Sequence, residues 1–182
     1  PSSAASDVYK RQALGYKFQD LALLRTALTH KSFSSEHNER LEFLGDALLN
    51  LYVTEYLYNK FDSLDEGKLT QFKATIVSRE NLTKIAQSIG LPNFIRTGKG
   101  ERLEGNSIPG NAVEALIGAV FLDSNYTKTN KFLNKLLKEK PEIHGIALTR
   151  MTIGTPGMPG DKDEPYVIYQ LIDGKYSVFM TI

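Results

Sequence analysis

The sequence predicts an all-α fold for most of the chain, followed by a short C-terminal tail that resembles a β-hairpin. From about residue 13 to residue 140, apolar residues recur every three or four positions, as on amphipathic helices. After Pro141 the composition changes to Pro, Gly, β-branched and aromatic residues. The chain has 182 residues, which is enough for one domain with a sizeable core and an appendage.

The first helices are expected within residues 20–30 and 38–61. Residues 1–12, PSSAASDVYKRQ, lack a helical pattern, and we expect a disordered lead or residues added to the native protein. In DLALLRTALTH, residues 20–30, Asp20 is the expected N-cap. The stretch NERLEFLGDALLNLYVTEYLYNKF, residues 38–61, is long enough for about six helical turns.

The middle of the chain predicts one amphipathic helix, a loop and two further helices. Residues 65–90, DEGKLTQFKATIVSRENLTKIAQSIG, read as a single helix that ends at Gly90 before Pro92. Residues 96–110, RTGKGERLEGNSIPG, are rich in Gly, polar and basic, as in a loop. Residues 111–125 and 127–140 complete the predicted domain of residues 13–140.

The tail, residues 141–182, predicts a linker and a hairpin. The segment IGTPGMPGDKDEP holds six Pro or Gly residues and does not suit a regular element. In YVIYQLIDGKYSVFMTI, Asp-Gly separates two apolar runs, which is a hairpin signal. Because a two-stranded hairpin is marginally stable alone, the tail either packs on the helical body or belongs to a truncated or divergent second domain.

Composition excludes several classes of site. The chain has no cysteine, so disulfides, zinc–thiolate sites and cysteine nucleophiles are ruled out, and a reducing, cytoplasmic location is expected. No run of about 18 apolar residues predicts a membrane span. The net charge of +1 favours no partner by itself, so nucleic acid would need local basic patches. The three histidines form no triad pattern, and we expect them to be structural.

Three acids lie close together in the second predicted helix. At 100° per residue, Glu39, Glu42 and Asp46 fall within an arc of about 60°, while the other faces are mostly apolar. We therefore expect a helix buried nearly all round. Buried like charges repel each other, and a divalent cation with a preference for hard oxygen ligands would resolve the conflict. The alternative is a solvent-exposed acidic stripe.

A second acidic position lies in GNAVEALIGAVFLD, residues 110–123. Asn111 and Glu114 share a helical face, and Gly118 on that face permits close approach of another helix. Two such helices would hold a metal ion between them. Alternatively, Glu114 forms a salt bridge with a buried arginine such as Arg40.

These segments together resemble the ribonuclease III family. NERLEFLGDALL resembles the family signature, and NAVEALIGAVFLD resembles its second segment. LGYKFQDLALLRTALTHKSF and LDEGKLTQFKATIVSRENLTKIA are similar to its opening and middle, so the resemblance is continuous from about Leu14 to Lys140. It implies a helical endonuclease domain that acts as a homodimer on double-stranded RNA with Mg²⁺, or Mn²⁺ as a substitute, leaving 5′-phosphate ends and 3′ overhangs.

The resemblance also implies roles for particular residues. Glu42, Asp46 and Glu114 correspond to metal-ligand positions. Asp46 and Glu114 would also be catalytic, together with Glu39, which begins the signature, and Glu66 in the middle segment. The implied functions are ribosomal and messenger RNA processing. Where the family most often has Asp, this chain has Asn111, which offers a carbonyl oxygen but no charge.

The remaining implied positions concern the partner subunit and the RNA. Phe43 corresponds to a residue that inserts into the partner subunit, with ordinary core packing as the alternative. We expect phosphate contacts from Lys68, Lys73, Arg96, Lys99 and Arg102, although solvated surface is the simpler interpretation of each lysine. The tail is too short for a complete RNA-binding domain. A catalytically impaired double-stranded-RNA-binding member of the same fold is the alternative that Asn111 favours. A carboxylate-bridged helical bundle is disfavoured because the Glu-x-x-His pattern is missing.

Overall fold

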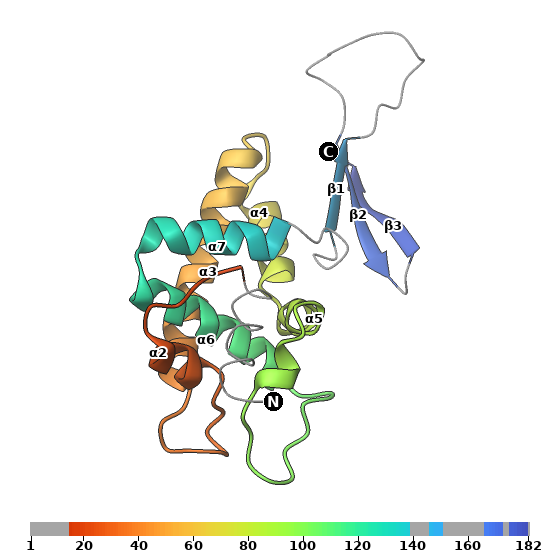
Figure 1. The fold of residues 1–182 in the computed structure, drawn as a ribbon. Coiled ribbons are helices and arrows are strands. Elements are labelled where there is room, and N and C mark those ends of the chain that lie inside the picture. The colour runs from red at the N-terminus through yellow and green to blue at the C-terminus, as the bar shows by residue number, and fades with distance from the viewer. Residues whose placement is uncertain (1–14, 139–145, 151–165, 173–174, 182) are drawn as a thin grey trace. The chain divides into compact units, whose positions relative to one another are not determined.

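The structure is a computed structural model that describes residues 15–138, 146–150, 166–172 and 175–181 (Figure 1). The chain divides into two compact units, Pro1–Glu139 and Lys140–Ile182. The expected lead at residues 1–12, the Pro/Gly-rich segment at 153–165 and His144 lie outside the described residues. Within the described part, no helix has the length and apolar character that a membrane span requires.

The described part of the first unit is helical, which confirms the predicted fold class. Asp20 caps the first of these helices as expected, because its side chain accepts a hydrogen bond from the backbone N–H of Ala22 at 2.7 Å. The elements are α2 (Leu21–Ala27), α3 (Glu39–Lys60), α4 (Glu66–Ile76), α5 (Arg79–Ser88), the 3-10 turn η1 (Leu91–Phe94), α6 (Ile108–Asp123) and α7 (Tyr126–Lys138).

The expectation of one helix over residues 65–90 was wrong, because the chain breaks between α4 and α5. The first helix ends at Ile76, and Ser78 caps the second, since its Oγ accepts a hydrogen bond from the N–H of Asn81 at 3.2 Å. The buried side-chain amide of Asn81 donates to the carbonyl of Ile76 at 2.7 Å. These local hydrogen bonds therefore interrupt the helix that the apolar periodicity predicts. Gly90 ends α5 in the left-handed region, with φ of 66°.

Helix α6 is the centre of the core. It packs against α2, α3, α5 and α7, and 11 of its 16 residues are buried. Leu116 and Ile117 on α6 and Leu49 and Val53 on α3 are at most 1% exposed. Each such side chain contributes roughly 1.5–3 kcal/mol through burial. This rigid pair of helices carries most of the acids singled out in the sequence.

The described residues of the second unit form three strands, β1 (Ile146–Arg150), β2 (Tyr166–Ile172) and β3 (Lys175–Thr181). They form an antiparallel sheet in the order β1-β2-β3, with a register shift at Ile168/Tyr169. The predicted hairpin corresponds to β2 and β3. Strand β1 was not predicted, because five residues beside a Pro/Gly-rich segment give too short a pattern to recognise.

Candidate active site

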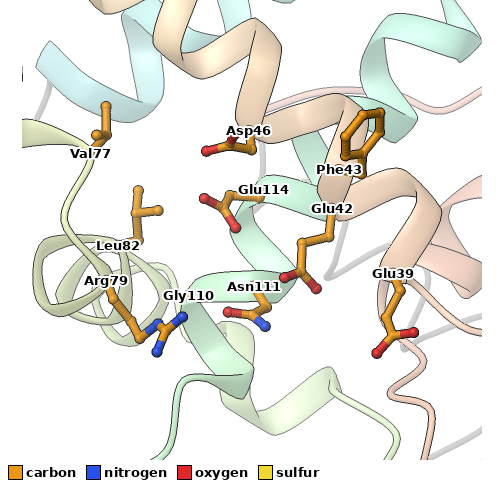
Figure 2. A pocket seen from close by; sticks show the side chains of 10 residues that line it. All are labelled: Glu39, Glu42, Phe43, Asp46, Val77, Arg79, Leu82, Gly110, Asn111 and Glu114. Carbon is orange, nitrogen blue, oxygen red and sulfur yellow. The ribbon is translucent and has the colours of Figure 1, made fainter.

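Three acids of α3, Glu39, Glu42 and Asp46, and Glu114 of α6 face a common cavity of about 540 Å³ (Figure 2). One wall comes from α3 and the other from the first turns of α6, with α5 closing one side. The structure thus brings together six residues singled out in the sequence, and the full lining consists of Glu39, Glu42, Phe43, Asp46, Val77, Arg79, Leu82, Gly110, Asn111 and Glu114.

Two glycines allow α3 and α6 to touch backbone to backbone. A Cβ atom on Gly45 would overlap the carbonyl group of Glu114 and lie 3.0 Å from the N atom of Gly118. A Cβ atom on Gly118 would in turn overlap the carbonyl oxygen of Leu41. The expected close approach at Gly118 is therefore present. Since Asp46 follows Gly45 directly, this contact places its carboxylate beside Glu114.

The site concentrates negative charge that the protein only partly compensates. Burial, and then the charges of Asp46 and Glu42, raise the pKa of Glu114 to about 7. Burial and the charge of Glu39 also raise the pKa of Glu42, against a hydrogen bond from the side chain of Asn111. Both shifts have the same origin, which is like charges held together in a partly desolvated space.

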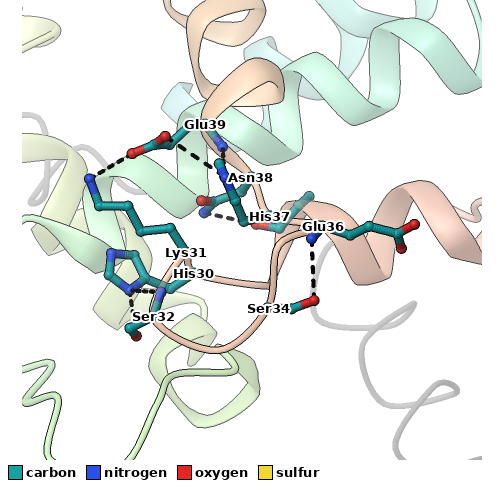
Figure 3. Close-up of polar contacts among 9 residues, drawn as sticks. His30, Lys31, Ser32, Ser34, Glu36, His37, Asn38 and Glu39 are labelled. Atoms are coloured by element: carbon teal, nitrogen blue, oxygen red, sulfur yellow. Dashed lines mark hydrogen bonds and ion pairs between the residues drawn. The ribbon is translucent and has the colours of Figure 1, made fainter.

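Glu39 has a different environment, at the exposed N-terminus of α3 (Figure 3). Lys31 Nζ lies 2.8 Å from Glu39 Oε1, and His37 Nδ1 lies 3.8 Å from its other oxygen. The hydrogen bond from Lys31 lowers the pKa of this carboxyl group. Asn38 fixes the start of the helix, because its buried side chain donates to the carbonyl of Ala27 at 3.3 Å. Glu39 is thus an ion-paired, partly exposed residue at the edge of the cavity.

The donor set of the cavity fits a hard divalent cation. Carboxylate and amide oxygens are the ligands that Mg²⁺ and Mn²⁺ prefer, and Mg²⁺ needs only a few of them from the protein. A cation would also relieve the repulsion that raises the pKa values of Glu42 and Glu114. As the side chains stand, no group of three or more His, Asp or Glu among the described residues is close enough to form a complete metal site.

The other residues implied by resemblance lie outside this cavity. Glu66 is the first residue of α4 and is exposed. Its proposed catalytic role stays a prediction, as do the roles of the five basic residues. Arg96 stacks over the ring of Phe33, with its guanidinium carbon 4.2 Å from the ring centroid. Lys68 and Lys73 are half-buried on α4. Lys99 and Arg102 are exposed in the loop before α6.

The expectation that the long helix is buried nearly all round was wrong. Phe43 is 80% exposed and Leu51 is 53% exposed, both on α3. Within residues 15–138, no side chain covers this face. Phe43 also borders a second cavity of about 760 Å³, which shares Glu39 with the first and is lined further by Thr26, His37, Arg40, Leu41, Leu44 and Leu122. The alternative that Phe43 is an ordinary core residue does not hold for this chain.

Sequence reasoning missed two basic residues at the site, Arg79 and Lys31. Arg79 is the first residue of α5 and lines the cavity. The expectation of one continuous helix gave no reason to place Arg79 at a helix start. Ser78, the residue before it, was the capping signal that could have indicated this start. Lys31 precedes its partner Glu39 by eight residues in a loop, where sequence periodicity gives no information about contacts.

The helical unit has the fold of a nuclease domain. Over 72% of this chain and 95% of the other, it matches a solved nuclease domain of ribonuclease III from Campylobacter jejuni, with a TM-score of 0.68 and 41% identity. The description of that structure concerns flexibility in a region involved in dimer formation. Residues 20–140 match the profile of the family described as Ribonuclease-III-like.

Curated relatives give the same result. The chain is 46% identical over 130 residues to the Ribonuclease 3 of Ralstonia pickettii, covering 69% of this chain and 51% of that relative. It is 41% identical over 148 residues to the Ribonuclease 3 of Treponema denticola, covering 76% and 59% respectively. The chain belongs to the ribonuclease III family, as the sequence predicted. It spans between half and three fifths of the length of these relatives.

Proposed function

We propose that this chain is a metal-dependent endoribonuclease that hydrolyses phosphodiester bonds of double-stranded RNA. The observation that carries the proposal is the convergence of Glu42, Asp46 and Glu114, from two helices, on one cavity. Membership of the ribonuclease III family and relatives named Ribonuclease 3 support it. The proposed products carry 5′-phosphates and short 3′ overhangs, and the proposed role is processing of ribosomal and messenger RNA.

Glu42, Asp46 and Glu114 would hold Mg²⁺, or Mn²⁺ in its place, and Asn111 would offer its carbonyl oxygen. When bound, the ion lowers the pKa of a water molecule and offsets charge that builds on the phosphate. The chain itself fixes the two helices by the glycine contact, so the carboxylates are held near one another before any ligand arrives.

The remaining acids have different tasks in this proposal. Lys31 holds Glu39 at the edge of the cavity. The negative charge of Glu39 there raises the pKa of Glu42. Asp46 and Glu114 are the acids that we place nearest the reacting phosphate. Glu66 lies at the start of α4, outside the cavity lining. Its proposed catalytic role rests on the resemblance to the family alone.

A homodimer would complete the proposed enzyme. Phe43 is an exposed aromatic side chain beside a cavity of about 760 Å³ that also has Leu44 and Leu122 in its lining. Exposed aromatic residues next to an apolar hollow are typical of protein interfaces. Since Phe43 and Glu39 line both cavities, the interface and the carboxylate site would be neighbours. Each subunit would then cut one strand of the duplex.

RNA would be recognised by its backbone and shape rather than by base sequence. The exposed Lys99 and Arg102 lie in the loop before α6, and Arg96 is fixed at the start of that loop. Lys68 and Lys73 on α4 would extend the phosphate contacts. The absence of cysteine from the chain is consistent with action in the reducing cytoplasm.

A second candidate function is binding of double-stranded RNA without efficient cleavage. The observation that favours it is Asn111, a neutral side chain in the lining of the carboxylate cavity. One fewer negative charge weakens the attraction for a divalent cation. The three retained carboxylates favour the active enzyme instead.

The two functions differ in a cleavage assay with a long RNA duplex. The active enzyme cuts the duplex only with Mg²⁺ or Mn²⁺, and the products accept a 5′ label only after phosphatase treatment. We expect Glu114→Gln and Asp46→Asn to lower the cleavage rate by about 100-fold or more, as when a group that acts at the reacting centre is removed.

Glu55→Gln is the matched control, because Glu55 lies on α3 outside the carboxylate cavity. Its cleavage rate should equal that of the native chain. Duplex binding without cleavage, restored to cleavage by Asn111→Asp, would establish the second function. No binding and no cleavage by the native chain would refute both.

A further inference from the structure

Arg79 is the basic residue of the carboxylate cavity. Of the described residues that line this cavity, four are acids, Asn111 is their amide neighbour, and Arg79 alone carries a positive side chain. Figure 2 shows its guanidinium group on the α5 side of the cavity, facing the first turn of α6. The cavity therefore has a negative wall on α3 and α6 and a positive group on its rim.

The fold holds Arg79 at this place. It is the first residue of α5, and the hydrogen bonds of Ser78 and Asn81 described above fix where that helix begins. The first turns of α5 and α6 touch, because a Cβ atom on Gly110 would lie only 3.4 Å from the carbonyl oxygen of Arg79. A guanidinium group on a fixed backbone loses less conformational entropy when it binds a ligand.

Arg79 lies in the same cavity lining as the acids without being paired with them. The ion pairs within 4.0 Å among the described residues are Lys31–Glu39, His37–Glu39 and Lys84–Glu80, and none involves Arg79. Its planar fork of N–H donors is thus available to a ligand in the cavity.

We propose that Arg79 binds the phosphate group of the RNA strand that lies over the carboxylate cavity. This inference rests on the proposed function. The guanidinium geometry matches phosphate oxygens and permits two parallel hydrogen bonds. A carboxylate cavity repels a polyanionic backbone, and a cation at the rim offsets this repulsion where the backbone must enter. Arg79 is accordingly a substrate-contacting residue, distinct from the metal-holding acids.

The rival explanation is that Arg79 only balances the charge of the acids. In that case, removing the charge of Arg79 would raise the Mn²⁺ affinity of the RNA-free protein and leave the affinity for RNA unchanged. Arg79→Ala and Arg79→Lys variants of the full chain distinguish phosphate binding from charge balance. Lys84→Ala is the control. Lys84 lies on the same helix, is paired with Glu80 and is absent from the cavity lining.

Duplex affinity is measured at several salt concentrations, in a Glu114→Gln background that prevents cleavage. We expect Arg79→Ala to weaken binding about tenfold and to reduce the slope of log affinity against log salt by about 1. Arg79→Lys keeps the slope but loses part of the affinity, because a single ammonium replaces the fork. Lys84→Ala should change neither. Melting temperatures establish that all variants are folded.

The inference is overturned if Arg79→Ala has the affinity and salt slope of its parent, whether or not Mn²⁺ binding tightens. If the parent background binds duplex and the native chain cuts it, that result leaves the proposed function standing. If the native chain neither binds nor cuts duplex RNA, the proposed function and this inference are overturned together.

Discussion

Gly45 on α3 and Glu114 on α6 are in direct backbone contact, so that a methyl group on Gly45 would occupy the position of the Glu114 carbonyl. We expect Gly45→Ala to force the two central helices apart. The loss should be about 3 kcal/mol or more in the free energy of unfolding, since neither backbone segment can yield easily. Chemical denaturation of the purified variant measures this quantity.

Gly67→Ala is the matched control for this change. Gly67 lies in the first turn of α4, and an added Cβ would meet only the Asp65 side chain at 3.2 Å. The change in stability should be below about 1 kcal/mol, because Ala also has the higher helix propensity. Equal losses for both variants would contradict the tight crossing of α3 and α6.

Asn111→Asp should strengthen the binding of divalent ions. The substitution adds a fifth carboxylate to the four that already line the cavity. Even in bulk water, unit charges about 4 Å apart interact by about 1 kcal/mol, so the affinity for Mn²⁺ should rise by at least about fivefold. Calorimetric titration of Mn²⁺ into the RNA-free protein gives the answer, with Glu55→Gln unchanged. An unaltered affinity would mean that Asn111 does not face the ion.

Phe43→Ala should weaken the proposed homodimer and shift the equilibrium towards monomer. Burial of an aromatic anchor at the centre of an interface typically contributes about 2 kcal/mol or more, which corresponds to a dissociation constant raised by at least about 20-fold. Sedimentation over a range of protein concentrations measures it. Tyr58→Ala is the control, because Tyr58 is 74% exposed on the same helix but borders neither cavity. A dimer of native strength in Phe43→Ala would exclude this surface.

Asp123 should make the stability of the helical unit depend on acid pH. Burial tends to raise its pKa, but hydrogen bonds from the N–H groups of Asp20 and Gln19 and from the hydroxyl of Tyr16 lower it overall. A lowered folded-state pKa means stabilisation that is complete above the ordinary Asp value and disappears as pH falls through the folded value.

The comparison with Asp123→Asn tests this linkage. At neutral pH the variant should be less stable by about 1–2 kcal/mol, since charge-assisted hydrogen bonds become neutral ones. The difference should shrink once the pH falls below about 4. Urea denaturation of both proteins across this range is the measurement, and a difference that is constant with pH would be inconsistent with the lowered pKa.

The sequence predicts the helices well where their signals are local. Asp20 is a recognisable cap, and the long apolar periodicity marks α3 and α6. The break between α4 and α5 is different, because Asn81 competes with the helix by bonding to Ile76, a contact that periodicity does not encode. Periodicity alone could not reveal the exposure of Phe43, since an apolar residue has the same pattern whether the chain or a second molecule covers it. Only the resemblance to the ribonuclease III family implied an interface position.

The acids of the site were predictable for a physical reason. Charged residues within apolar helical faces are costly, so Asp46 and Glu114 stand out in the sequence itself. Arg79 is at the start of a helix, where a charged residue is ordinary, and only the packing of Gly110 against α5 brings it to the cavity. Contacts between distant segments decide such positions.

The glycine crossing of α3 and α6 has a consequence for the lifetime of the protein. Asp46 and Glu114 become neighbours only when the two helices dock, so an unfolded chain has no preassembled chelate. A divalent ion held by both would favour the folded form alone and raise its melting temperature with increasing ion concentration. The concentration of magnesium would then set the resistance of the protein to proteolysis as well as its rate of RNA cleavage.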